Sequence, residues 1–193
     1  MSDRDLIVVD VETTGLNVGL HVPIEVAAIN TRTGEQRNFF PRLSADALAV
    51  AAPEALAVNR YFERRCFEHA LDADETVAAY GDLLEFLAGA TLGGANVRFD
   101  AAMLMAGVRA ARYPSFIVDV NHEPWHFRLA DLESAAAGAL GLPMTELPSL
   151  ARCCELLGVK NIDPHTALGD ATATAACFAR IAELPKPEPK AKP

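Results

Sequence analysis

Short apolar runs, divided by turn-forming residues, predict the strands of this chain. The β-branched run Leu6–Val9 leads into Asp10-Val11-Glu12 and then a glycine, which is typical of a buried strand that ends in a functional loop. The runs Ile24–Ile29 and Gln36–Phe40 flank Thr33-Gly34, and this spacing predicts two strands joined as a hairpin. Two shorter segments complete the set of expected strands: Thr91–Gly94 and Phe127–Leu132.

Helical composition and capping residues predict the other elements. Ser149 is a good N-cap and Gly158 a good stop, so a helix is expected between them. Asp74 is expected to cap a helix through Leu87. Further helices are expected in four segments: Ser44–Asn59 on both sides of Pro53, Ala101–Arg112, Ser134–Leu140 and Ala167–Leu184. A hairpin followed by strands alternating with helices indicates an α/β domain with a mixed sheet.

The length and apolar content predict one domain over residues 1–184. The chain has 193 residues, 51% of them hydrophobic, and roughly 150 residues per domain is the usual prior. Residues 185–193 are rich in Pro and Lys, and we expect a disordered or extended tail. The polar start lacks a signal-peptide pattern, and no stretch approaches the ~20 apolar residues of a membrane helix. We therefore expect a cytoplasmic protein without membrane contact.

Charge and cysteine content narrow the possible functions. The formal net charge of -9 argues against a protein that holds long nucleic acid by neutralising many phosphates. It does not exclude a nuclease, because bound divalent cations reverse the local charge where phosphate must sit. Without a C-x-x-C pair, the cysteines are expected to be reduced core residues instead of zinc ligands or disulfides: Cys66, Cys153, Cys154 and Cys177.

Carboxylates and one histidine form the candidate chemistry. Asp10 and Glu12 are two residues apart at the end of an apolar strand, so their side chains share a face. Their charges repel unless they bind a cation, and carboxylate oxygens are the ligands that Mg²⁺ and Mn²⁺ prefer. Asp100 and Asp170 are each expected near the start of a helix. His165 precedes Asp170 by five residues, in the loop before the last helix.

Three motifs resemble those of the DEDDh exonuclease superfamily, which includes the proofreading subunit of bacterial replicative polymerase, ribonuclease T and oligoribonuclease. The segment Asp10-Val11-Glu12-Thr13-Thr14-Gly15 resembles its first motif, and Asn96-Val97-Arg98-Phe99-Asp100 resembles its second. The third motif, His-x-Ala-Leu-x-Asp-Ala, is matched by residues His165–Ala171. The motifs occur in the family's order, and the resemblance covers about residues 5–183.

The resemblance implies a ribonuclease H-like α/β fold, with a mixed five-stranded sheet that contains an antiparallel hairpin and is flanked by helices. It also implies two bound Mg²⁺ or Mn²⁺ ions and stepwise hydrolysis of phosphodiester bonds from a 3′ end. His165 would be the general base, in keeping with the unperturbed histidine pKa of about 6.5. Two metals roughly 3.5 to 4 Å apart can clamp the attacking and leaving oxygens. The implied metal ligands are Asp10, Glu12, Asp100 and Asp170.

The resemblance assigns substrate contacts as well. Thr13 would contact the terminal nucleotide, and Leu16 and Phe99 would wedge between or stack on bases, although Phe99 also suits a core position. Asn96 of the second motif completes the expected substrate-binding set. The 3′ end of single-stranded DNA is the preferred substrate, with RNA trimming or oligoribonucleotide turnover as the alternative.

The chain departs from the family's pattern at two positions. Ala95 stands where many members have His, and Gly169 occupies a position that is often acidic or polar. Neither change removes an expected ligand, but both bear on substrate positioning. A DNA polymerase is a candidate partner by resemblance, and docking of the Pro/Lys tail onto a partner is weighed against a merely solvated tail.

Two other classes of function compete with this interpretation. His122-Glu123-Pro124-Trp125-His126 matches the H-E-x-x-H letters of zinc proteases, which need both histidines on one helical face. Pro124 opposes a helix there, because an interior proline costs about 3 kcal/mol or more. A catalytically inactive nucleic-acid or polymerase-binding relative is the other alternative, and it is disfavoured because every expected ligand and the histidine are present.

Overall fold

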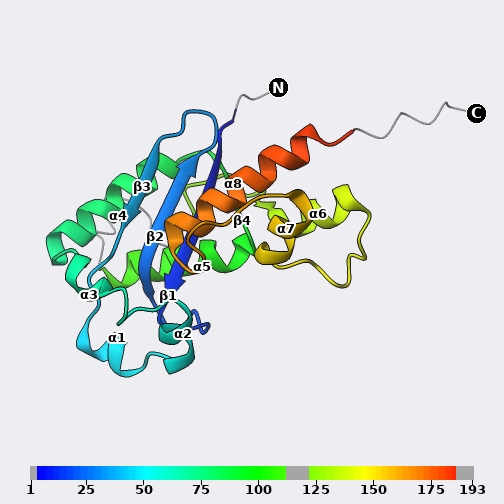
Figure 1. The fold of residues 1–193 in the computed structure, drawn as a ribbon. Helices are drawn as coiled ribbons and strands as arrows, with labels where there is room; N and C mark the ends of the chain where they lie inside the picture. Colours follow the sequence, from blue (N-terminus) through cyan, green and yellow to red (C-terminus); the bar gives the residue numbers. More distant parts are fainter. Residues whose placement is uncertain (1–3, 112–121, 186–193) are drawn as a thin grey trace, which may run out of the picture.

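A computed structural model describes residues 4–111 and 122–185 (Figure 1). Within this part of the chain, five strands form one sheet in the order β3-β2-β1-β4-β5. The strands are β1 (Leu6–Thr13), β2 (Pro23–Asn30), β3 (Gln36–Phe39), β4 (Thr91–Gly94) and β5 (Ala130–Asp131). β2 pairs antiparallel with both β1 and β3, whereas β1–β4 and β4–β5 are parallel. The expected mixed sheet with an antiparallel hairpin is confirmed.

Helices cover both faces of the sheet (Figure 1). Alternate residues of β1 face opposite sides, as the two-residue period requires. Val9 packs in a cluster with residues of α4 and α5, whereas Val8 packs against the start of α8. The helices are α1 (Ala45–Ala49), α2 (Pro53–Val58), α3 (Cys66–His69), α4 (Ala73–Leu87), α5 (Val97–Ala110), α6 (Leu132–Leu140), α7 (Leu150–Leu157) and α8 (Ala167–Glu183). Residues 8, 10 and 12 are alternate residues of β1 and share one face of the sheet. Asp10 and Glu12 therefore lie on the same face as Val8, which α8 covers.

Local capping explains where most helices begin and end. α7 starts after Ser149, whose Oγ accepts the Arg152 amide proton, and ends at Leu157, where Gly158 follows in the left-handed conformation with φ 67°. Both ends of this helix match the sequence prediction. The expected division of residues 44–59 around Pro53 is also confirmed, because Pro53 is the first residue of α2. Proline suits this position, where its missing N–H is not needed.

Three sequence predictions about boundaries were wrong. The cap of α4 is Asp72 and not Asp74, because Asp72 and Glu75 form a reciprocal capping box. α5 begins at Val97 instead of Ala101, which places Asp100 in its first turn. β5 has two residues instead of the expected 127–132, because the Asp131 side chain accepts the Ser134 amide proton and starts α6 at once.

Other sequence expectations concern the cysteines, membranes and the tail. All four cysteines are free and buried, as predicted. In the ranges that the structure describes, no helix is long and apolar enough to cross a membrane. The expected tail lies outside the described residues except for Pro185. Most of the segment 113–128, for which the sequence predicted no clear element, also lies outside them.

We predict that Asp72→Ala destabilises the protein by about 1 kcal/mol, since it removes the side-chain carboxylate that accepts the Glu75 amide proton. Asp74→Ala is the matched control: it loses an acidic side chain from the same helical turn but no capping bond, and it should cost less than half as much. Urea unfolding of both variants measures the difference. Equal losses would contradict the assignment of the cap.

Candidate active site

The four acids proposed from the sequence come from three elements. Asp10 and Glu12 end the central strand, where they lie opposite Ala27 and Glu25 of β2 in the antiparallel register. Asp100 and Asp170 lie in the first turns of α5 and α8. These positions suit acids, because the exposed amides of a first helical turn favour negative charge. The fold thus gathers the four acids at the carboxyl end of β1.

Asp100 is tied to the central strand by its own side chain. Its Oδ1 accepts a hydrogen bond of 3.1 Å from the backbone amide of Val11. Burial raises the pKa of Asp100 well above its ordinary value, and this effect outweighs the hydrogen bond from Val11, which lowers it. The charges of Glu12 and Asp170 raise the pKa further. A buried acid that stays this close to other acids indicates a site adapted to a cation.

The pKa values of Asp10 and Glu12 are raised in the same way. Burial is the largest cause of the raised pKa of Asp10, followed by the charges of Asp100 and Asp170. Burial also raises the pKa of Glu12 to about 7, with further contributions from Asp170 and Glu25 that Arg64 offsets in part. Burial is the main cause of both pKa shifts, and the repulsion between neighbouring acids that adds to them is what a divalent cation would relieve.

His165 joins this group. One potential ligand atom from each of Glu12, His165 and Asp170 lies within 4.8 Å of the other two. In the described part of the chain, this is the one group of at least three acidic, histidine or cysteine side chains with such spacing. Hard oxygen donors and one imidazole are a suitable donor set for Mg²⁺ or Mn²⁺ with a base beside it. The side chains present therefore fit the expected metals.

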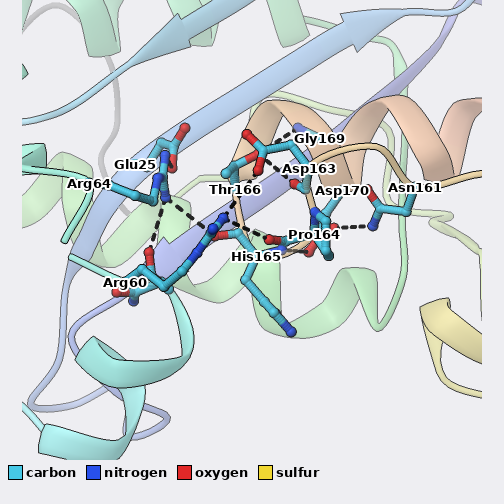
Figure 2. A network of polar contacts seen from close by, with 11 residues as sticks. Glu25, Arg60, Arg64, Asn161, Asp163, Pro164, His165, Thr166, Gly169 and Asp170 are labelled. Atoms are coloured by element: carbon cyan, nitrogen blue, oxygen red, sulfur yellow. Dashed lines mark hydrogen bonds and ion pairs between the residues drawn. The ribbon is translucent and has the colours of Figure 1, made fainter.

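The loop before α8 is fixed by hydrogen bonds at the acid itself (Figure 2). Asp170 Oδ1 accepts from the Asn161 side-chain amide, and Asp170 Oδ2 accepts from the His165 backbone amide at 3.3 Å. The Thr166 side chain caps the helix by accepting the Gly169 amide proton. Gly169 leaves no room for a side chain, since a Cβ there would lie 2.1 Å from the Asp163 carbonyl oxygen. The departure from the family's pattern at this position thus has a local steric cause.

A groove of about 600 Å³ adjoins the acids. Three expected substrate-contact residues line it: Thr13, the 80% exposed Leu16, and Phe99. Phe99 also packs against the core, so the two roles considered for it from the sequence are compatible. A second set of lining residues comes from α2 and the residues on either side of it: Ala52, Glu54, Ala55, Val58 and Asn59. A mostly apolar hollow next to a charged cluster suits a ligand with a flat base and an anionic phosphate.

Two expected contact residues have other roles in the structure. The Thr13 hydroxyl donates to the Gly15 carbonyl at 2.9 Å and accepts the Gly15 amide proton, so it shapes the loop itself. Asn96 is the N-cap of α5 with φ 57°, and its exposed side chain makes no capping bond. Asn96 is not among the residues that line the groove.

The sequence reasoning missed Glu25, Arg64 and the α2 wall. Glu25 is buried in β2 beside Glu12, and its carboxylate accepts from Arg64 at 2.7 Å. Glu25 could have been found from the sequence, because it is a lone acid in an apolar strand, and that strand was expected to follow the one that carries Asp10 and Glu12. No local pattern marked Arg64, which lies in a turn.

The protease-like segment has no suitable geometry. Residues His122–His126 form no helix. Instead, the Gly89 amide donates to the Pro124 carbonyl at 2.9 Å, and the His126 amide donates to the Ala90 carbonyl at 2.8 Å. These bonds tie the segment to the loop before β4. Without a helical face that carries both histidines, the zinc-protease alternative is wrong.

Comparison with known proteins shows which family the chain resembles. A family model described as Exonuclease (RNase_T) matches residues 7–178. Ribonuclease T of Salmonella typhimurium is 28% identical over 188 residues, covering 91% of this chain and 83% of the relative. Ribonuclease T of Escherichia coli strain K12 is 27% identical over 189 residues, with the same two coverages of 91% and 83%.

Solved structures share the fold. E. coli exonuclease I in complex with a dT13 oligonucleotide aligns with a TM-score of 0.68 at 22% identity. The zinc-bound form of an E. coli exonuclease I complex with single-stranded DNA aligns with a TM-score of 0.70 at 20% identity. Each alignment covers 94% of this chain and 41% of the other, so this chain spans about two fifths of those proteins.

The family match covers most of the chain and includes the stretch from the first acidic motif on β1 to the third motif on α8. The ribonuclease H-like arrangement of the sheet and its helices is shared with the exonuclease structures. The chain therefore belongs to the exonuclease family and is a member of the DEDDh-type 3′-5′ exonucleases.

Proposed function

We propose that the protein removes nucleotides from the 3′ end of single-stranded nucleic acid, with DNA as the preferred substrate. The convergence of four acids and His165 beside a groove of about 600 Å³ carries this proposal. A single-stranded end suits the site, because an apolar groove can receive an unpaired base while the adjoining acids lie near its phosphate.

Asp10, Glu12, Asp100 and Asp170 would hold two Mg²⁺ or Mn²⁺ ions. When bound, such ions neutralise phosphate charge and make a coordinated water more acidic. The protein's own contribution is the fixed cluster of oxygens, which β1, α5 and α8 hold together before substrate arrives. Asp170 is held in place by Asn161 and by the His165 amide, so its oxygens have fixed directions.

His165 would take the proton from the attacking water. Its imidazole lies beside the Glu12 and Asp170 carboxylates, and the residue is exposed, so water can reach the ring. A neutral imidazole accepts a proton at neutral pH, and neighbouring carboxylates stabilise the imidazolium that forms. Leu16 and Phe99 would contact the terminal base from the groove.

The comparisons support two substrates. Exonuclease I structures that share this fold contain a dT13 oligonucleotide or single-stranded DNA, which favours DNA. The sequence relatives are named ribonuclease T, which favours RNA trimming as the second candidate. The relatives and structures described above do not support the DNA polymerase partner considered from the sequence, and we do not retain it.

We predict that the protein releases mononucleotides from the 3′ end of DNA oligonucleotides in Mg²⁺ or Mn²⁺, more rapidly than from matched RNA. Substrates labelled at the 3′ or the 5′ end distinguish the direction: an early loss of the 3′ label with a ladder of 5′-labelled products is expected. Chelator should abolish release. Full activity in chelator would contradict the metal mechanism. Faster digestion of RNA than of DNA would show that RNA is the preferred substrate.

His165→Gln should lower kcat about 10²- to 10⁴-fold, because it removes the proton acceptor but keeps a polar side chain of similar length. Glu123→Gln is the control from the rejected protease motif and should leave nuclease activity unchanged. Steady-state kinetics on a single-stranded DNA substrate measure both. A His165→Gln variant with wild-type kcat would remove this residue from the mechanism.

The raised carboxylate pKa values predict a pH-dependent stability in metal-free buffer. The pKa of Glu12 rises from 4.5 to about 7 on folding, so the folded chain binds protons more tightly than the unfolded chain. This contribution to stability is complete below about pH 4.5 and is lost as the pH rises through about 7.

Melting temperatures in chelator should therefore fall between about pH 5 and about pH 8, and added Mg²⁺ should reduce the fall. Asp10→Asn removes one charge of the cluster, so the same pH series should be flatter for this variant while activity is lost. A wild-type melting temperature that rises over this interval would contradict the raised carboxylate pKa values of the folded chain.

A further inference from the structure

His165 has an uncommon backbone conformation for a residue other than glycine. Its φ of 62° lies in the left-handed region, where a side chain with a Cβ is disfavoured. The loop before it is exposed from Ile162 to His165, so core packing does not impose this conformation. Strained residues persist at functional sites when surrounding contacts hold them. The contacts that hold His165 therefore decide where its imidazole points.

Two arginines from the turn after α2 provide such contacts (Figure 2). Arg64 Nη1 donates to the His165 carbonyl at 3.3 Å and to the Asn59 carbonyl at 3.2 Å. Arg60 Nη2 donates to Asp163 Oδ1 at 3.1 Å and to the Pro164 carbonyl at 3.3 Å. The loop is thus held at three successive residues by side chains about one hundred positions earlier in the chain.

Arg64 is itself fixed by a buried acid. Its Nη2 donates to Glu25 Oε2 at 2.7 Å, and the two side chains are only 19% and 3% exposed. Glu25 belongs to β2, the strand next to Glu12, so the guanidinium is anchored to the sheet. A planar guanidinium can bond two carbonyls and a carboxylate at once, which a lysine cannot do with the same geometry. These partners occupy both terminal nitrogens of Arg64.

The same turn also connects the groove to the catalytic loop. Ala55, Val58 and Asn59 line the groove immediately before Arg60. The Asn59 side-chain amide donates to the Thr13 carbonyl at 3.1 Å, which fixes the turn to the end of β1. The wall that would contact the terminal nucleotide and the loop that carries the imidazole are therefore parts of one connected structure.

We propose that Arg64, anchored by Glu25 and assisted by Arg60, is a positioning residue that holds His165 in its left-handed conformation and so aims the imidazole at the acids. This inference rests on the proposed function of His165 as the general base. Arg64 acts on the reaction through His165 and not by contact with the substrate. Its loss should therefore affect the rate of the chemical step more than substrate binding.

The test compares Arg64→Met with Arg64→Lys and uses Arg65→Met as the matched control. Arg65 is the next residue, is 67% exposed, and pairs with Glu68 instead of the loop. Arg64→Met should lower kcat about 10- to 100-fold with KM within about twofold of wild type. Arg64→Lys should recover part of the loss, and Arg65→Met should behave like wild type.

A double-mutant cycle separates positioning from a general structural role. In the His165→Ala background, Arg64→Met should change the remaining kcat by less than about twofold, because its target is absent. Multiplicative losses in the double variant would overturn the proposal, and so would a rise in KM as large as the fall in kcat. If Arg64→Met does not fold, the same cycle is run with Arg64→Lys.

Hydrogen exchange provides a readout that does not depend on catalysis. The His165 amide, which donates to Asp170, should exchange faster in Arg64→Met than in wild type or Arg65→Met. An unchanged exchange rate of the His165 amide would contradict the proposal that Arg64 holds this loop, even if activity fell. If wild type releases no nucleotides, the proposed function fails, whereas the exchange rates still decide whether Arg64 holds the loop.

Discussion

Mutual repulsion among carboxylates is the constraint on which this structure depends. The alternation of β1 places Asp10 and Glu12 on one face, and α8 covers that face and adds Asp170. Burial raises the pKa of Asp10 and of Glu12 most, and the charges of the neighbouring acids raise both pKa values further. Such an arrangement costs free energy in the absence of a cation, so the rest of the domain must hold it together.

Packing on both sides of the central strand supplies that support. Val8 and Val9 are fully buried on opposite faces of the sheet, against α8 on one side and the α4–α5 layer on the other. The acids lie where elements end: at the carboxyl end of a strand and in the first turns of two helices. At these places a charge interrupts no regular packing, and helix amides favour it.

The site has two parts with different chemistry. The acidic cluster suits cations and phosphate, whereas the groove along α2 suits a base. This division agrees with the net charge of -9, because a few bound cations at one point can replace an extended basic surface. The turn that carries Arg60 and Arg64 lies between the two surfaces and joins them to the sheet.

The sequence by itself determined the features that short-range rules encode. The hairpin, the two ends of α7, and the spacing of Asp10, Glu12, Asp100, His165 and Asp170 in three motifs all follow from local periodicity, caps and motif order. Tertiary structure decided the rest. The shortness of β5, the Asp72 cap, the use of residues 122–126 as a tether, and the Glu25–Arg64–His165 connection were not evident from local sequence. The last two join residues far apart in the chain, whose proximity arises from packing of the whole domain.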